Sequence, residues 1–320
     1  MKSGVRLVSF VLAVLLSLFL GACVSSSTQK NASSCPEPPT PRYGSWQAFN
    51  TRSVTQEQIA QRDLLKKMPA FESSTLRLPY HLYSPPVQQH ERYPLVVYLH
   101  GGAGIGENAE HIQYRHALPF LASSNSLLSE TFRSRFPVFI LAPQCECEFG
   151  DNEWSSQGGA FFDAQRGASP VGKALEELVE SMLETYPIDP ARIYLTGISM
   201  GGAGAWDLAV RRPDLIAAAI PLAGHSPSVS SSQSLAQSKI PVWVHQGEGD
   251  ENNPIEETQA TVDALRNLGA CTWLSRYPAG STQEIDPGDT GGDDLQHTVW
   301  MRAYLNPDLW PWVLSIKKQR

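Results

Sequence analysis

The chain has few charged residues and no excess of basic ones. Only 18% of its 320 residues are charged, and 25 Lys and Arg stand against 32 Asp and Glu, for a formal net charge of −7. A protein that grips a phosphate backbone needs a basic surface, so this composition argues against nucleic acid as a partner. The 24 Gly and 24 Pro follow no repeat period, which argues against collagen-like and solenoid folds. The 42% of hydrophobic residues supplies a large core.

Long hydrophobic runs are also missing. The apolar run Leu7–Leu20 is too short for a permanent membrane helix, and it follows Lys2 and Arg6 in the charge order of a secretory signal. The run ends in Leu20-Gly21-Ala22-Cys23, which resembles the lipobox of bacterial lipoproteins, whose cysteine is lipidated after cleavage. We therefore expect a lipoprotein signal peptide over residues 1–22. The alternative is an ordinary signal peptide in which Cys23 is incidental.

The segment after Cys23 indicates how the protein is held at the membrane. Val24 follows the cysteine, and in lipoproteins an Asp at that place favours the inner membrane, so the resemblance implies the outer membrane. Residues 24–42 are rich in Ser and Pro and cannot bury apolar surface. We expect a lipidated Cys23 and tether over residues 23–70 and a folded domain over 71–320. The expected location is the bacterial cell envelope, at the periplasmic face or cell surface, with the lipid as the sole membrane contact.

Cysteines are scarce. Four follow Cys23, and an exported protein sits in a compartment that permits disulfides, where four thiols allow three full pairings. They are Cys35, Cys145, Cys147 and Cys271. A metal site at the closely spaced pair Cys145 and Cys147 would need a second group of ligands at suitable spacing, which the sequence does not offer nearby. We expect structural thiols and no metal.

Short apolar runs bounded by Gly or Pro recur along the chain and predict buried strands. They cover residues 93–99, 136–142, 192–196, 217–222, 240–245 and 272–278. Apolar residues at three- and four-residue steps predict a helix over 171–183, and the same period is weaker over 255–268 and 309–317. This alternation predicts a single α/β domain with a mostly parallel sheet and helices on both faces.

Ser199 lies in Gly197-Ile198-Ser199-Met200-Gly201, a G-x-S-x-G pattern that joins a predicted strand directly to a helix starting near Met200. In that context the pattern predicts a tight turn that lifts the serine above the sheet edge as a nucleophile, with glycines that let strand and helix approach. The alternative is a plain helix N-cap, which the preceding strand and the following small residues disfavour.

A serine hydroxyl is a poor nucleophile unless a base and an orienting acid assist it. With G-x-S-x-G the expected order along the chain is Ser, acid, His, with the acid after a later strand. Asp250 follows the predicted strand 240–245, and Glu248 and, less favoured, Glu251 are the alternative acids. His297 follows the last predicted strand and is the predicted general base.

Other residues near the same sheet edge leave alternatives open. His225 follows the predicted strand 217–222, so it is a pocket-lining or surface histidine or a rival base, while His245 lies inside a strand and is expected in the core. The long acidic, Gly-rich stretch 280–296 predicts a mobile connection or lid, with calcium binding as a weaker alternative. For a developing oxyanion we expect the backbone N–H of Met200 and a second N–H after His100, at Gly102 or else Ala103.

With these residues identified, the stretch from about residue 76 to 314 resembles the α/β-hydrolase superfamily. Within it, the chain is most similar to bacterial carboxylesterases, the so-called predicted peptidases, and the polyhydroxybutyrate-depolymerase and feruloyl-esterase-like group. The matching segments are Tyr98-Leu99-His100-Gly101, Ala142-Pro143-Gln144-Cys145, residues 189–197, Ser199 with its glycines, Gly247-Glu248-Gly249-Asp250 and His297-Thr298-Val299-Trp300. The resemblance implies Ser199, Asp250 and His297 as a catalytic triad.

The resemblance also implies a substrate site and a reaction. The resemblance implies Trp154 near the substrate pocket, and the positions of His225 and Trp300 near the expected cleft make them further candidates for substrate binding. The chain departs from the family at Gln296, which precedes the histidine after an acidic insert where the family has a short loop ending in Gly-His. We expect a carboxylesterase that cleaves short or moderately sized esters, including acylated carbohydrate, through an acyl-enzyme without cofactor or metal. The alternatives are a serine peptidase and an inactive binding module, and the sequence predicts no oligomeric state.

Overall fold

The computed structural model describes residues 35–40, 56–106, 126–147, 153–155, 167–278 and 297–318. The predicted signal peptide, the predicted lipidation site Cys23 and the acidic stretch 280–296 lie outside these residues, as does most of the predicted tether. All described residues belong to one compact unit, Cys35–Arg320. In this part of the chain, no helix combines the length and the apolar character needed to cross a bilayer.

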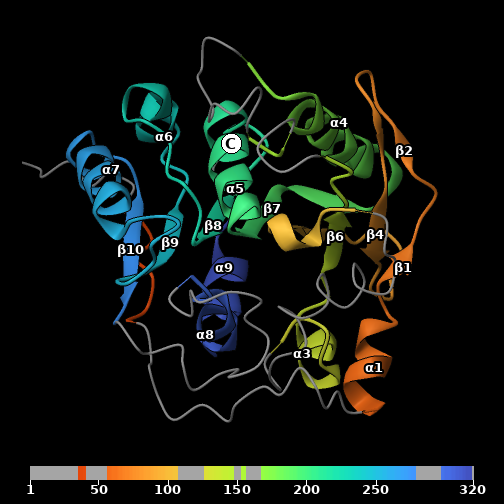
Figure 1. Cartoon of the computed structure of the whole chain (residues 1–320). Coiled ribbons are helices and arrows are strands. Elements are labelled where there is room, and N and C mark those ends of the chain that lie inside the picture. Colours follow the sequence, from red (N-terminus) through yellow and green to blue (C-terminus); the bar gives the residue numbers. More distant parts are fainter. Residues whose placement is uncertain are drawn as a thin grey trace, which may run out of the picture. The chain divides into compact units, whose positions relative to one another are not determined.

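An eight-stranded sheet forms the centre of the fold, in the order β1-β4-β6-β5-β7-β8-β9-β10 (Figure 1). The strands are β1 (Lys66–Lys67), β4 (Tyr80–Tyr83), β5 (Tyr93–Leu99), β6 (Phe139–Pro143), β7 (Ile188–Ile198), β8 (Ala218–Leu222), β9 (Val242–Gly247) and β10 (Thr272–Tyr277). β5 to β10 pair in parallel, and β1 and β4 add an antiparallel edge. A separate pair, β2 (Phe71–Glu72) and β3 (Arg77–Leu78), is antiparallel. The predicted α/β class with a mostly parallel sheet is confirmed.

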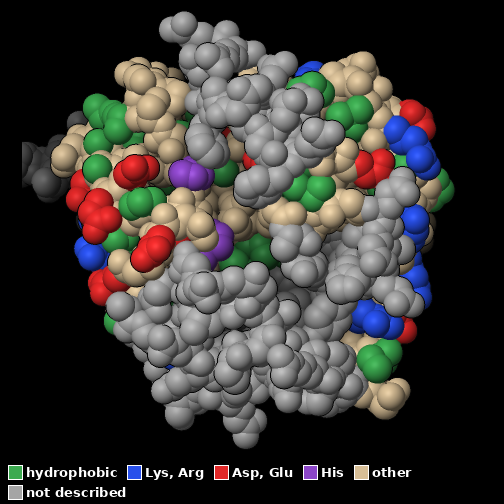
Figure 2. All heavy atoms as spheres, viewed as in Figure 1, with side chains coloured by type: hydrophobic (Ala, Val, Ile, Leu, Met, Phe, Trp, Pro, Cys, Tyr) green, Lys and Arg blue, Asp and Glu red, His purple; other side chains and the backbone are tan. Residues whose placement is uncertain are grey.

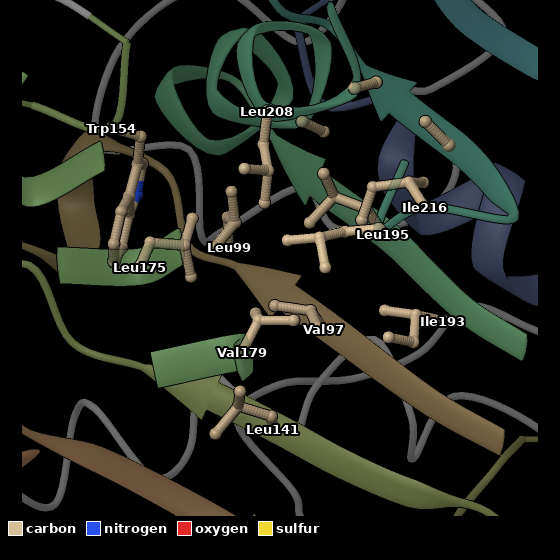
Figure 3. Packing of buried hydrophobic residues seen from close by; sticks show 14 of the residues in the cluster. Val97, Leu99, Leu141, Trp154, Leu175, Val179, Ile193, Leu195, Leu208 and Ile216 are labelled. Carbon is tan, nitrogen blue, oxygen red and sulfur yellow. The ribbon is translucent and has the colours of Figure 1, made fainter. Parts of the chain in front are cut away.

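Helices cover both faces of the sheet (Figure 1). They are α1 (Gln56–Arg62), α3 (Glu130–Arg135), α4 (Pro170–Thr185), α5 (Met200–Arg211), α6 (Gln233–Ser238), α7 (Ile255–Asn267), α8 (Trp300–Leu305) and α9 (Leu309–Ser315), with 3-10 turns η1 (Gly102–Gly104) and η2 (Ser230–Ser232). On β5, Leu95, Val97 and Leu99 pack in the cluster formed with α4 and α5, as Figure 3 shows for part of it. Val96 and Tyr98 pack in the cluster formed with α3, α8 and α9. Strand side chains alternate between faces, so a strand buried on both sides reads as a continuous apolar run.

The folded unit begins earlier than the boundary expected at residue 71. Strand β1 pairs with β4 at Lys66 opposite Leu82, which makes it part of the main sheet. Further upstream, Cys35 is joined to Cys271 by a disulfide. Both lysines of β1 are exposed, so a search for buried apolar runs does not detect an edge strand of this kind.

The four cysteines that follow Cys23 pair as two disulfides, Cys35 with Cys271 and Cys145 with Cys147. Of the three pairings that the sequence allowed, this one joins one distant pair and one pair two residues apart. The expectation of structural thiols is confirmed. The Cys145–Cys147 bridge follows the end of β6, beside the loop that leaves β5.

Candidate active site

Ser199 sits on a sharp turn between β7 and α5, with φ 52° and ψ −118°. A non-glycine residue at such angles is strained, and such strain persists only where the surrounding structure imposes it. Here a β-carbon on Gly197 would lie 2.2 Å from the Gly201 carbonyl oxygen, and one on Gly201 would lie 2.1 Å from the Leu99 carbonyl oxygen. The backbone N–H of Ser199 also donates to Leu222 at 2.9 Å. Both glycines are therefore required for the turn that presents Ser199.

Three side chains from distant parts of the chain form one hydrogen-bonded line. His297 Nε2 lies 2.8 Å from Ser199 Oγ, and His297 Nδ1 lies 2.9 Å from Asp250 Oδ2. An ionised carboxylate only accepts hydrogen bonds, so Nδ1 carries the imidazole proton and Nε2 is free to accept from the serine. The Asp250 side chain is fully buried and that of His297 is 14% exposed. This arrangement can remove the proton from the serine hydroxyl.

The Asp250 carboxylate is saturated with donors. Its Oδ1 accepts the backbone N–H groups of Asn252 and Asn253, each at 3.0 Å. Its Oδ2 accepts Gln246 Nε2 at 2.6 Å in addition to His297. Four donors on one buried carboxylate satisfy its oxygens and fix its plane.

The alternative acids and the alternative base do not take part in this hydrogen-bonded line. Glu248 is paired with Arg276 at 3.1 Å on the surface, and Glu251 is exposed. His225 is half-buried beside the site, and burial is the main cause that lowers its pKa. The charge of His297 lowers it further, against the raising effect of nearby carboxylates. The histidine in hydrogen-bond contact with both Ser199 and Asp250 is His297.

His245 lies in the core, as its place within a strand predicted. It is fully buried, and its Nδ1 lies 2.8 Å from the Tyr277 hydroxyl. Burial lowers the pKa of His245 to about 3, so its imidazole is neutral at physiological pH. It contributes packing among aromatic rings, with Trp243 at 4.6 Å between ring centroids.

The two predicted oxyanion donors lie on either side of Ser199. Met200 is the first residue of α5, where backbone N–H groups have no partner within the helix. On the other side, the Gly101–Gly102 loop approaches so closely that a β-carbon on Gly101 would lie 3.4 Å from the Ser199 β-carbon. The loop continues into η1, which contains both Gly102 and the alternative donor Ala103. This placement is compatible with both predicted donors.

A buried set of polar side chains holds this loop. His100 Nε2 accepts the backbone N–H of Cys145 at 2.9 Å, and its Nδ1 lies 2.8 Å from the Gly101 carbonyl oxygen. The bond from Cys145 requires an unprotonated Nε2, so His100 is the neutral tautomer with its proton on Nδ1. Gln144 Nε2 donates to the Gly104 carbonyl at 2.6 Å. The segment after β6 thus fixes the loop after β5.

Of the aromatic residues expected to bind substrate, Trp154 has a different role. Its side chain is fully buried, and its Nε1 donates to the His100 carbonyl at 3.1 Å. A β-carbon on Gly204 would lie 2.4 Å from the Trp154 β-carbon, so the indole packs tightly on α5. Trp154 therefore supports the loop from behind and does not line an open pocket. Trp300 is partly exposed and meets the His297 ring edge-on at 5.3 Å between centroids.

Two buried glutamines of the site were not predicted as functional residues from the sequence. Gln144 and Gln246 are buried at the ends of β6 and β9, with 2% and 0% of their surface exposed. An amide is costly to bury without partners, so a glutamine within or directly after an apolar strand run is a usable signal. The partners of Gln246 lie in the loop that follows it, and Gln144 reaches the loop after β5, contacts that a single sequence does not reveal.

Charge is unevenly distributed on the face that carries the site. Figure 2 shows histidine side chains in a hollow of this face, acidic side chains to their left, and most of the visible Lys and Arg at the far right. The carboxylates that act electrostatically on His225 include Glu257, Asp250 and Glu153. The described ionisable groups that act on His225 thus include three carboxylates and His297.

Several known proteins are similar to this chain. Residues 146–281 match the Dienelactone hydrolase family. The chain is 30% identical over 134 residues to poly(3-hydroxyalkanoate) depolymerase C of Paucimonas lemoignei, and 25% identical over 159 residues to S-formylglutathione hydrolase of Rattus norvegicus. Among solved structures, a thermostable esterase aligns over 81% of this chain with a TM-score of 0.68 and 27% identity.

These similarities cover only part of each protein. The two curated matches span 41% and 45% of this chain, and 28% and 51% of the relatives. The chain covers 64% of the thermostable esterase. The similarity establishes the architecture of the matched region, in which Ser199 and Asp250 lie.

Proposed function

Because the chain belongs to the α/β-hydrolase superfamily, we propose that it is a serine hydrolase that cleaves carboxylic esters through an acyl-enzyme. The observation that carries this proposal is the hydrogen-bonded line from Ser199 through His297 to Asp250. The strained Ser199 lies 2.8 Å from His297, and His297 lies 2.9 Å from Asp250. A strained nucleophile next to a positioned base is typical of a site for acyl transfer.

In the proposed reaction, His297 Nε2 takes the hydroxyl proton while Ser199 Oγ attacks the ester carbonyl carbon. The carbonyl oxygen becomes an oxyanion that the N–H groups of Met200 and Gly102 stabilise. Imidazolium at His297 then gives its proton to the leaving alcohol, and the acyl group remains on Ser199. Water, deprotonated by the same nitrogen, releases the acid and restores the serine. Asp250 keeps the imidazole in the required tautomer throughout.

The proposed substrates are short or moderately sized esters with neutral parts, such as acylated carbohydrate. Trp300 beside His297 offers an aromatic surface for a sugar or aryl group. The carboxylates around His225 disfavour an anionic acyl group. The sequence of the predicted 280–296 loop has few large apolar residues, unlike the lid that a long-chain lipase needs.

A p-nitrophenyl ester series tests the proposal. We expect acetate and butyrate to be hydrolysed faster than palmitate at equal concentration, and Ser199→Ala to lose this activity. The same three residues can also cleave amides. Peptide arylamides measured in parallel therefore distinguish an esterase from a peptidase. Rates that rise from acetate to palmitate would contradict the substrate proposal, and an unaffected Ser199→Ala would contradict the mechanism.

We further propose that a lipid on Cys23 anchors the protein in the cell envelope. The supporting feature is the lipobox-like Leu20-Gly21-Ala22-Cys23 after an apolar run. Expression in a bacterial host with labelled palmitate tests this: the wild type should carry the label, and Cys23→Ala should not. Label on both, or on neither, would contradict the anchor.

A further inference from the structure

Gln246 is a buried amide placed directly behind the acid of the site. It lies near the end of β9 with none of its surface exposed. Its Nε2 lies 2.6 Å from Asp250 Oδ2 and 2.7 Å from the Asn253 carbonyl oxygen. Both neighbours accept hydrogen bonds, so the amide nitrogen must face them and the orientation of the side chain is determined.

This orientation leaves the other end of the amide without a partner. Within the described residues, no hydrogen-bond donor reaches Gln246 Oε1, although the atom is buried. An unsatisfied buried carbonyl costs stability, and an apolar residue at this strand position would avoid that cost. The two hydrogen bonds that Gln246 Nε2 donates offset the cost of the unsatisfied carbonyl.

Both bonds act on the loop that carries the acid. The contact with the Asn253 carbonyl fixes the end of the Asp250 loop, and Asn253 Nδ2 in turn donates to the Ala223 carbonyl at 2.8 Å. The contact with Asp250 Oδ2 falls on the same oxygen that accepts from His297. Gln246 therefore determines where that oxygen lies, and hence the direction in which the imidazole points.

We propose that Gln246 is a positioning residue that holds Asp250 so that His297 is aimed at Ser199. The inference rests on the proposed function, since it concerns the efficiency of the same hydrolysis. Because the side chain is buried behind Asp250, it acts through the acid and does not contact substrate.

The test compares Gln246→Met, which keeps the size of the side chain and removes the donor, with the wild type. We expect kcat for p-nitrophenyl acetate to fall about tenfold to a hundredfold with KM nearly unchanged, because the loss is one of orientation. The acid limb of the kcat/KM profile should move to higher pH. With one hydrogen-bond donor fewer, the Asp250 carboxylate stabilises the His297 imidazolium more strongly. The substitution leaves Asp250 and His225, the two groups that face His297, in place.

Two further variants keep the test decisive. Gln61→Met is a matched control, because Gln61 also donates from Nε2 to a carboxylate, that of Glu57 at 3.2 Å, on α1. It should leave kcat and the pH profile unchanged. Gln246→Leu is the second variant if Gln246→Met does not fold, since it also removes the donor, and it should give the same fall in kcat.

If the wild type is active and the folded Gln246 variants keep its kcat and pH profile, the positioning role is wrong while the proposed function stands. A wild type that hydrolyses no ester would instead overturn the proposed function. If kcat falls equally in Gln246→Met and Gln61→Met, the effect is general destabilisation and the positioning role is wrong.

Discussion

His100 and Cys145 follow different strands, β5 and β6, yet they contact each other: the backbone N–H of Cys145 donates to His100 Nε2 at 2.9 Å. Through this contact the segment after β6 controls the loop beside Ser199. The Cys145–Cys147 bridge restrains that segment directly at the donor residue.

Removal of the Cys145–Cys147 bridge should therefore affect catalysis more than stability. The bridge closes a ring of a few residues, so the chain-entropy contribution is small, on the order of 1–2 kcal/mol. In Cys145→Ala/Cys147→Ala we expect kcat/KM to fall about tenfold, because one oxyanion donor loses its fixed place. Ester kinetics and thermal unfolding measured on the same sample check this. Full activity with a large drop in Tm would contradict it.

The other bridge should show the opposite behaviour. Cys35 and Cys271 are 236 residues apart in sequence, and cross-linking so long a loop restricts the unfolded chain strongly. In Cys35→Ala/Cys271→Ala we expect the free energy of unfolding to fall by about 3–5 kcal/mol while kcat stays near that of the wild type. Denaturant unfolding and ester hydrolysis test the two halves of the prediction, and a loss of kcat at unchanged stability would refute it.

Gly201 should not tolerate even a methyl group. A β-carbon there would lie 2.1 Å from the Leu99 carbonyl oxygen, which is backbone and has no room to move aside. We expect Gly201→Ala to lose ester hydrolysis at least a hundredfold or to fail to fold. Gly167→Ala is the control: φ is +75° there but the space is open, so the cost should be about 1 kcal/mol without loss of activity. Similar behaviour of the two variants would contradict the tight turn.

Two buried histidines should make the fold sensitive to acid. Burial lowers the pKa of His245 to about 3, and burial together with the Lys67 charge lowers that of His81 to about 4. Between these values and the ordinary 6.5, the unfolded chain binds protons that the folded chain does not. Above pH about 6.5 the two histidines do not change the free energy of unfolding. As the pH falls from there toward 3, they lower the free energy of unfolding.

Thermal unfolding at a series of pH values from 7 to 4 measures this effect. Carboxylates with lowered pKa, such as Asp189 and Asp214, add a loss of the same sign, so the comparison with His245→Phe isolates the histidine. The variant should lose stability less steeply than the wild type as the pH falls. Parallel curves would show that His245 does not contribute.

The sequence predicted those parts of the fold whose signal is local. β5 has the predicted bounds, 93–99, because a strand buried on both faces is a continuous apolar run. β1 and β4 were not predicted, since a two-lysine edge strand and a four-residue strand have no comparable pattern. The pairing of the cysteines required the fold, because sequence spacing does not determine which thiols meet.

The same distinction applies to the site. Ser199 is recognisable from a pentapeptide, and Asp250 and His297 from their order after particular strands. Trp154 was placed near the pocket by the family resemblance, whereas its buried side chain packs beneath the His100 loop. Gln246 has meaning only beside Asp250, a relationship that needs the turn between them to be formed.

Covalent labelling of Ser199 tests the central claim most directly. A fluorophosphonate reacts with a serine whose hydroxyl is activated by a neighbouring base, and mass spectrometry identifies the modified residue. The account predicts that the wild type is labelled at Ser199, that Ser199→Ala is not labelled, and that His297→Ala is labelled far more slowly. No label on the folded wild type, or a label that persists in Ser199→Ala, would contradict it.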